Sequence, residues 1–380
     1  MIRCADNVTA LSRACVFGNL ALLPYWILFA LWLIAAFQYN RVHTAAGALA
    51  RPRPRAVAIV YILVLATALM MGLRYEVGAD WFTYLDNYDM VQLLSYDQAI
   101  ETFDIGYSTL VFLAGRADAG IWLVNFVCGL IMTAGIARFC ARQDNPALSF
   151  LVAVPYLVIV VGMGYTRQGV AIGIILAGLA DADGRSSLKV ILFILAAALF
   201  HRTALLVLPL ALAPLARRNL LQAILGAVAF AILALLLLRQ ASDQLVTTYI
   251  SQDYESGGAV VRVAMNIVPA ILTLLLRKRL GFSDYQRDMW SVFAIVALAT
   301  FGLVLTTSFT TAIDRLALFL IPLQIAILPR LPYALARSRQ TNAQLLLAVC
   351  AYSAAIQLVW LAFATHAAYW VPYKVTFLDA

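Results

Sequence analysis

Long apolar blocks separated by short polar segments account for most of this chain of 380 residues. A helix needs roughly 17–25 apolar residues to cross the hydrocarbon core of a bilayer, and most of the blocks approach that length. The pattern therefore predicts an all-α, polytopic bundle of about twelve membrane-spanning helices, with boundary errors of a few residues. The blocks lie at about residues 19–38, 56–73, 120–138, 147–163, 167–181, 188–201, 203–215, 219–238, 260–276, 289–308, 313–329 and 342–364.

One of these blocks is too short for an ordinary span. Residues 203–215 would form a helix of about 20 Å, whereas the hydrocarbon core is about 30 Å thick. The block contains Pro209 and Pro214, and only His201 and Arg202 join it to the preceding block. Helices of this kind are tolerated where they line a protein-walled or water-filled cavity. We therefore expect some short or broken helices around an outward-facing cleft.

Basic residues concentrate in alternate polar segments. The segment Arg41–Arg55 is strongly basic, and the positive-inside rule assigns such segments to the cytoplasm. Counting alternate sides from there assigns both chain ends and the cleft to the outer side, which in a bacterium is the periplasm. The sequence thus predicts a multi-pass protein of the bacterial inner membrane whose cleft faces the periplasm.

The composition supports a membrane protein and argues against other classes. Hydrophobic residues make up 64% of the chain and charged residues 12%, whereas soluble domains average about 45–50% and 25%. The net charge of +8 reflects basic cytoplasmic loops, so we expect no nucleic-acid partner. The five cysteines form no CxxC pair, and we expect neither a disulfide framework nor a metal site. The sequence contains no P-loop and no dinucleotide-binding fingerprint, so we expect no cofactor. Residues 1–380 are expected to form one transmembrane domain with larger outer loops at about 74–119 and 239–259.

Five unusual polar segments lie on the outer side in this orientation. They are "GLRYEVGADWFTYLDNYD" from Gly72, "YTRQ" from Tyr165, "FHRTAL" from Phe200, "TAIDRLALF" from Thr311 and "YWVPYK" from Tyr369. The orientation was derived from the basic loops without reference to these segments. Their common side therefore indicates a common site.

Arginines within these segments are candidates for binding an anion. Basic residues are depleted at the outer ends of spans, yet four lie there: Arg74, Arg167, Arg202 and Arg315. A guanidinium presents a rigid fork of donors that suits phosphate or carboxylate. In the alternative interpretation each arginine reaches the membrane interface or pairs with a nearby acid, and Asp314 and Arg315 satisfy each other.

Two residues are candidates for a general base. Histidine titrates near neutral pH, and His201 lies beside Arg202 at the tip of a predicted hairpin. Asp80 in "VGADW" is the second candidate. The alternatives are a histidine that caps a helix and an acid that is simply solvated. Aromatic residues around Asp80 could stack on sugars or form an interfacial belt.

These segments resemble the EpsG-like branch of the Wzy-type exopolysaccharide and O-antigen polymerases. The resemblance rests on "LRYEVGADWFTYLDNY", "YTRQGVAIGI", "FHRTALLVLPL", "GGAVVRVAMNIVPAILTLLLRKRL" and "WVPYK", in this order between about residues 60 and 375. Two departures are mild: Ala79 stands where the family often carries a hydroxyl residue, and Thr203 where serine is common.

The resemblance implies a metal-independent, integral-membrane glycosyltransferase without a cofactor. Its substrates would be undecaprenyl-diphosphate-linked oligosaccharides, serving as donor and acceptor at the periplasmic leaflet. The growing chain would pass from its lipid carrier to a sugar hydroxyl of a new repeat unit. Membrane lipids, a chain-length regulator and a flippase are the other partners that it suggests.

The chemistry assigns roles to the candidate residues. We expect Arg167 and Arg74 to bind the departing diphosphate, with Arg315 as a third candidate, because cationic donors are needed where charge develops. We expect His201 to be the base that takes the proton of the acceptor hydroxyl, with Asp80 as the second candidate. The other residues expected to contact substrate are Gln168, Tyr165, Arg202, Asp314, Tyr373 and Lys374.

Other functions are compatible with the same pattern. An O-antigen-ligase-like enzyme, or a transferase that uses a polyprenyl-monophosphate sugar, would need a similar outer site. A transporter of lipid-linked oligosaccharides would favour charged residues through the depth of the cavity and on both sides. A membrane acyltransferase is a weaker alternative.

Overall fold

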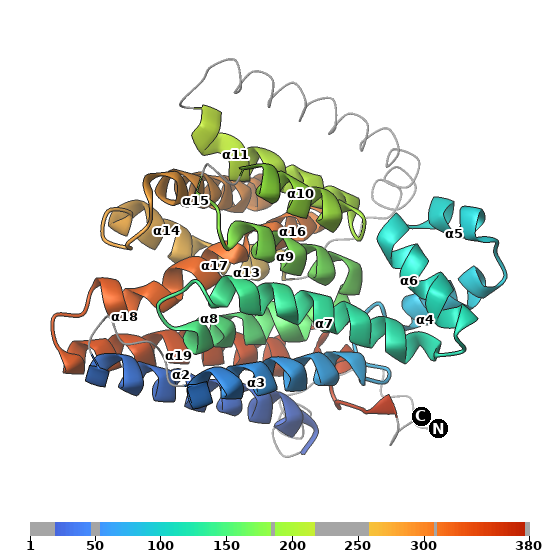
Figure 1. Cartoon of the computed structure of the whole chain (residues 1–380), viewed down its shortest axis with the longest axis horizontal. Helices are drawn as coiled ribbons and strands as arrows, with labels where there is room; N and C mark the ends of the chain where they lie inside the picture. Colours follow the sequence, from blue (N-terminus) through green and yellow to red (C-terminus); the bar gives the residue numbers. More distant parts are fainter. Residues whose placement is uncertain (1–19, 47–53, 184–186, 217–257, 308–309, 377–380) are drawn as a thin grey trace.

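A computed structural model describes residues 20–46, 54–183, 187–216, 258–307 and 310–376 (Figure 1). Throughout these residues the regular elements are helices, and no strand is formed. The predicted all-α fold is therefore confirmed. The apolar block at 219–238 lies outside the described residues, as does the second outer loop at 239–259 apart from residues 258–259.

The helices follow the apolar blocks of the sequence. Those of the bundle are α2 (Leu23–Ala46), α3 (Pro54–Gly72), α7 (Gly120–Cys140), α8 (Pro146–Ala153), η2 (Val154–Gly162), α9 (Thr166–Leu179), α10 (Ser187–Ala198), η3 (Arg202–Val207), α11 (Leu208–Ala216), α13 (Ala259–Ala264), α14 (Ile267–Leu276), α15 (Asp284–Thr306), α16 (Thr310–Ala317), η5 (Leu318–Leu320), α17 (Pro322–Ile327), η6 (Leu328–Arg330), α18 (Leu331–Ala334) and α19 (Arg339–Phe363). Several blocks are interrupted, as the prolines and polar residues within them predict.

Six helical segments are long and apolar enough to cross a membrane. They are Leu23–Asn40, Gly120–Cys140, Ala259–Leu276, Asp284–Thr306, Thr310–Ala334 and Arg339–Phe363. Five shorter apolar segments accompany them: Val57–Gly72, Pro146–Gly162, Thr166–Leu179, Ser187–Ala198 and Arg202–Leu215. The chain is a multi-pass membrane protein, and the total of twelve crossings stays a prediction.

The centre of the bundle is a hairpin made of α8, η2 and α9. Every residue of η2 and nearly every residue of α9 is buried, so this hairpin is enclosed by other helices. Helix α8 packs against α2, α7, α17 and α19, whereas α9 packs against α7 and α10. The chain that enters and leaves the hairpin tip is therefore held by protein on all sides.

Small residues allow α7 and α9 to approach closely. A Cβ atom placed on Gly135 would lie within 3.0 Å of the Gly173 carbonyl oxygen, and one on Gly173 within 3.0 Å of the Met132 backbone. Small residues commonly form such interfaces between membrane helices, where packing drives association. The contact fixes the position of α9, which carries Arg167 and Gln168 at its start.

The second half of the hairpin's first arm is a π-helix. Segment η2 contains Pro155, which lacks the N–H that a regular helix needs. The carbonyl of Ile159 in this segment accepts a hydrogen bond of 2.9 Å from the indole of Trp370. Trp370 is fully buried, and a Cβ on Gly164 would lie within 3.0 Å of its ring. The C-terminal segment thus packs directly on the hairpin tip.

One end of the bundle, which we call the outer end, carries a separate group of short helices. These are α4 (Trp81–Gln92), α5 (Tyr96–Thr102) and α6 (Ile105–Arg116), and Figure 1 shows them together beyond the end of α7. Trp81, Tyr84 and Val91 form the buried face of α4, and α5 starts with a capping box. The first expected outer loop, at 74–119, is therefore largely helical because its apolar residues recur at helical spacing.

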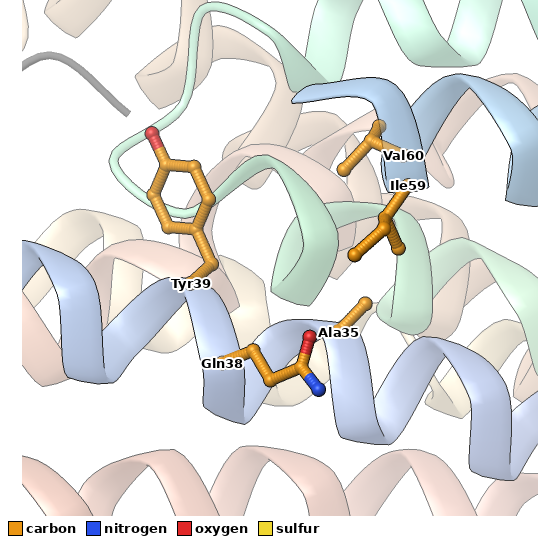
Figure 2. Close-up of a pocket in the computed structure, with 5 residues that line it drawn as sticks. All are labelled: Ala35, Gln38, Tyr39, Ile59 and Val60. Carbon is orange, nitrogen blue, oxygen red and sulfur yellow. The ribbon is translucent and has the colours of Figure 1, made fainter. Parts of the chain in front are cut away.

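The opposite end gathers the segments predicted to be cytoplasmic. The Arg330 guanidinium donates 3.0 Å hydrogen bonds to Gln143 Oε1 and to the Leu280 carbonyl. Asn145 donates to the Ala36 carbonyl. A small pocket between α2 and α3 also lies toward this end, lined by Ala35, Gln38, Tyr39, Ile59 and Val60 (Figure 2). This pocket is remote from the polar segments of the outer end.

Candidate active site

The five polar segments found in the sequence meet at the outer end. The Arg74 guanidinium donates a hydrogen bond to Thr166, which precedes Arg167 in "YTRQ". The Arg74 backbone forms a β-bridge with Val375 of the C-terminal segment. Arg167 and Arg202 share a carboxylate, and Gln168 reaches the backbone of the "TAIDR" segment. Packing of the central hairpin against its neighbours brings together residues as far apart in the chain as Arg74 and Val375.

Asp104 is the charged residue around which this site is organised. Its carboxylate is 7% exposed and lies 3.1 Å from Arg167 Nη1 and 3.4 Å from Arg202 Nε. His201 Nδ1 is 3.9 Å from the same carboxylate. A buried carboxylate is costly unless it is compensated, and three basic side chains surround this one. Asp104 holds the α9 arginine next to the tip of the α10–η3 hairpin.

His201 lies at that hairpin tip, between α10 and η3. Its backbone is extended, and its carbonyl accepts a hydrogen bond from the Ala204 N–H in the first turn of η3. The imidazole ring stacks on Phe319 with a centroid distance of 6.3 Å. The side chain is 28% exposed and therefore remains accessible from outside the bundle.

Asp80 is the second candidate base and has a different environment. It precedes α4, and its carboxylate does not cap that helix. Burial raises the pKa of Asp80, and the positive charges of Arg315 and Arg167 partly oppose this shift. Asp80 is thus a partly buried acid close to both arginines. Within the described part of the chain no hydrogen bond or ion pair engages its side chain.

Gly78 brings the Asp80 segment against the hairpin tip. Its φ of +111° lies in a region that side chains disfavour, and a Cβ there would lie within 3.0 Å of the Met163 carbonyl oxygen. The Gly78 N–H donates to the Tyr369 carbonyl at 2.8 Å. Only glycine permits this approach of three backbone segments.

Arg315 stacks on Tyr165, with its guanidinium carbon 3.9 Å from the ring centroid. Gln168 donates a 2.7 Å hydrogen bond to the Arg315 carbonyl. Its other amide atom, Oε1, is buried without a partner among the described residues. These contacts join α9 to α16 and hold Arg315 beside Asp80.

Asp314 does not pair with its neighbour Arg315. It forms a bidentate ion pair with Arg262 of α13, with distances of 2.8–3.0 Å and both side chains nearly buried. The alternative that Asp314 and Arg315 satisfy each other is therefore wrong. Because adjacent helical residues point in different directions, Asp314 faces Arg262 while the Arg315 guanidinium stacks on the ring of Tyr165.

Arg74 is 1% exposed, and its guanidinium is fully occupied by protein. It donates to the Val77 and Met71 carbonyls and, through Nη2, to Asn125 Oδ1 and Thr166 Oγ1, both at 2.9 Å. The fork of donors that we expected to face a diphosphate instead joins the end of α3 to α7 and α9. A buried guanidinium with these partners stabilises the site from beneath.

The family comparison agrees with these observations. The family model described as "EpsG family" matches residues 57–375. The chain belongs to the EpsG family. This family membership and the apolar helices identify a membrane protein of the exopolysaccharide polymerase or glycosyltransferase type. Searches among curated proteins and among solved structures give no match.

Two further residues of this EpsG protein belong to the site but were absent from the sequence-based set: Asp104 and Arg262. Asp104 stands before the apolar helix α6, where an acid usually serves only as a cap. Arg262 interrupts an apolar block within "GGAVVRVAMN", much as Arg167 does. That interruption was the signal that could have found it.

Tyr373 and Lys374 lie in the C-terminal segment of this EpsG chain. The Tyr373 hydroxyl donates to the Met70 carbonyl at 2.7 Å, and Lys374 forms an ion pair with Glu76. Both contacts attach the segment to the end of α3. Among the described residues no group of three His, Cys, Asp or Glu side chains lies close enough to share a metal ion. Metal independence stays a prediction.

Proposed function

We propose that this EpsG family protein polymerises undecaprenyl-diphosphate-linked oligosaccharide repeat units at the periplasmic leaflet of the bacterial inner membrane. The carrying observation is that anion-binding and proton-accepting side chains occur together at the outer end. Arg167 and Arg315 both lie near Asp80, and His201 shares the Asp104 carboxylate with Arg167. Transfer from a diphosphate to an alcohol requires both kinds of group.

The reaction balances without a cofactor. The acceptor hydroxyl gives its proton to the base, and its oxygen forms a bond to the anomeric carbon of the donor sugar. The bond between that carbon and the diphosphate oxygen breaks, and undecaprenyl diphosphate leaves with the electron pair. Arg167 and Arg315 stabilise the negative charge that develops on the leaving group. His201 is the proposed base, with Asp80 as the alternative.

Other residues of the site have supporting roles in this proposal. Gln168 and Tyr165 orient sugar or phosphate oxygens, with Gln168 Oε1 as the unpaired acceptor. Arg202 adds positive charge at the hairpin tip. Arg74, Asp314, Tyr373 and Lys374 hold the surrounding segments, because their side chains already bind protein groups. A flippase that delivers repeat units and a chain-length regulator are the proposed partners.

The test is a polymerisation assay with purified protein in lipid nanodiscs. Polyprenyl-diphosphate-linked repeat units supplied as both donor and acceptor should yield a ladder of products. A single transfer to a different lipid acceptor would instead indicate an O-antigen-ligase-like enzyme. The absence of any glycosyl transfer with these substrates would contradict the proposal.

Substitution of Arg167 tests the diphosphate contact. Arg167→Ala should slow transfer by at least about 100-fold, as loss of one transition-state donor does. Arg167→Lys should remain at least about tenfold impaired, because lysine cannot offer a two-pronged contact. Arg116→Lys is the matched control, since Arg116 is exposed at the end of α6 and stacks on Phe112. Full polymer length with Arg167→Ala at normal expression would exclude this role.

A further inference from the structure

Asp104 is unusual for a residue that precedes a helix. A side chain at this position ordinarily accepts a hydrogen bond from the first turn of its own helix. Asp104 makes no such bond and is nevertheless 7% exposed. Its carboxylate turns away from α6 toward Arg167, His201 and Arg202. Asp104 therefore contacts basic residues at the two hairpin tips and does not cap its own helix.

The two carboxylate oxygens have different partners. Oδ1 accepts a 3.3 Å hydrogen bond from the Arg202 backbone N–H and lies 3.4 Å from Arg202 Nε. Oδ2 lies 3.1 Å from Arg167 Nη1 and 3.9 Å from His201 Nδ1. A distance of 3.9 Å is too long for a hydrogen bond. The Arg202 backbone therefore fixes Oδ1 in place. Oδ2 is paired with Arg167, and it is also the oxygen to which His201 Nδ1 would have to donate.

We propose that Asp104 is a positioning residue that couples binding of the diphosphate to activation of His201. The inference rests on the proposed function. A bound diphosphate attracts the Arg167 guanidinium and weakens its contact with Oδ2. The carboxylate then accepts a hydrogen bond from His201 Nδ1–H. This bond selects the tautomer whose Nε2 is free to take the proton of the acceptor hydroxyl, following the logic of hydrolase triads.

His201 lies beside the Asp104 carboxylate, which Arg167 from α9 and the adjacent Arg202 also contact. Phe319 covers one face of its ring. Asp104 is the anion that these three basic side chains share. Its removal would free the Arg167 guanidinium for a phosphate group and would leave His201 Nδ1 without a carboxylate to which it could donate.

The experiment compares the intact protein with Asp104→Asn, which keeps the shape of the side chain and removes its charge. Binding is measured with inorganic pyrophosphate, and single-turnover transfer is measured with a polyprenyl-diphosphate-linked repeat unit. Asp97→Asn is the matched control, because Asp97 is an exposed acid on the neighbouring helix α5. Thermal unfolding of each variant reports whether the fold is retained.

The expected result for Asp104→Asn is a combination that simple structural damage would not produce. Pyrophosphate should bind about two- to fivefold more tightly, because Arg167 loses a competing carboxylate. Transfer should nevertheless slow by about 100-fold, because His201 loses the group that orients it. Asp97→Asn should match the unmodified protein in pyrophosphate affinity, transfer rate and unfolding temperature.

Two results would overturn the coupling. Weaker pyrophosphate binding together with slower transfer would make Asp104 only a structural support. An unchanged transfer rate would show that His201 does not depend on it. Both differ from failure of the proposed function, in which the unmodified protein itself would show no glycosyl transfer with these substrates.

Discussion

Single residues at the outer end differ in whether protein groups already satisfy their charge. Arg74 and Asp314 are buried, Arg262 is nearly buried, and all three are bonded to protein groups. Their charges therefore stabilise the fold. Asp80 has the opposite character, since burial raises its pKa without a bonded partner among the described residues. Charged groups left in this state commonly mark functional sites.

Replacing Asp80 should therefore have opposite effects on stability and on transfer. A carboxyl group whose pKa is raised in the folded state binds its proton more tightly there than in the unfolded state. Its contribution to stability is lost as pH rises through that pKa, so ionised Asp80 destabilises the fold near pH 7. Asp80→Asn should raise the unfolding temperature at pH 7 and slow transfer by about tenfold or more.

The measurements are thermal unfolding and transfer rate at pH 5 and pH 7. The stabilisation should shrink at pH 5, where more of the native Asp80 is already protonated. Asp86→Asn is the control, because Asp86 is exposed on the same helix α4. Unchanged transfer by Asp80→Asn would remove Asp80 from the set of candidate bases.

At the scale of elements, the site is built on a hairpin tip held from three sides. The Ile159 carbonyl in the π-helix η2 accepts a hydrogen bond from the Trp370 indole. Gly78 and Gly164 let neighbouring segments approach the tip. π-helices are rare in proteins, and those that occur often lie at functional sites. Arg167 and Gln168 follow this tip directly, so any displacement of the supporting segments moves them.

Gly78→Ala tests this dependence. The added methyl group meets the Met163 carbonyl, and its φ of +111° is strained for alanine, so the Asp80 segment must shift. We expect loss of at least about 1 kcal/mol of stability, together with impaired transfer. Gly302→Ala is the matched control, since nothing lies within 4 Å of a Cβ at that position of α15. Equal unfolding temperatures for the two variants would contradict the proposed constraint.

At the scale of the whole molecule, polar groups are divided between the two ends of an apolar bundle. Asp80, Asp104, Arg167 and His201 lie at the outer end, whereas Arg330 and its partners lie at the opposite one. This separation agrees with the basic loops predicted to be cytoplasmic. It also favours a site at one membrane face over a charged path through the membrane.

Cysteine labelling can test the orientation. Asp97→Cys and Gln340→Cys place exposed thiols at the outer and opposite ends, in a protein whose Cys4 and Cys15 are replaced by serine. A membrane-impermeant maleimide should label position 97 in cells with a permeabilised outer membrane. It should label position 340 only after the inner membrane is broken. The reverse pattern would place the site in the cytoplasm.

The sequence by itself determined the membrane class, the positions of the apolar helices among the described residues and the set of polar segments that meet at one end. These features depend on local spacing and on the alternation of basic loops, which can be followed along the chain. The helical nature of 81–116 could also have been found from its spacing.

Only the tertiary structure decided which charges pair. Asp104 contacts Arg167, which is 63 positions away in the chain, and Arg202, which is 98 positions away. Asp314 pairs with Arg262 and does not pair with the adjacent Arg315. Burial of Arg74 likewise depends on how α3, α7 and α9 pack. Partners of this kind follow from close contacts between helices distant in sequence, and the type of residue alone does not determine them.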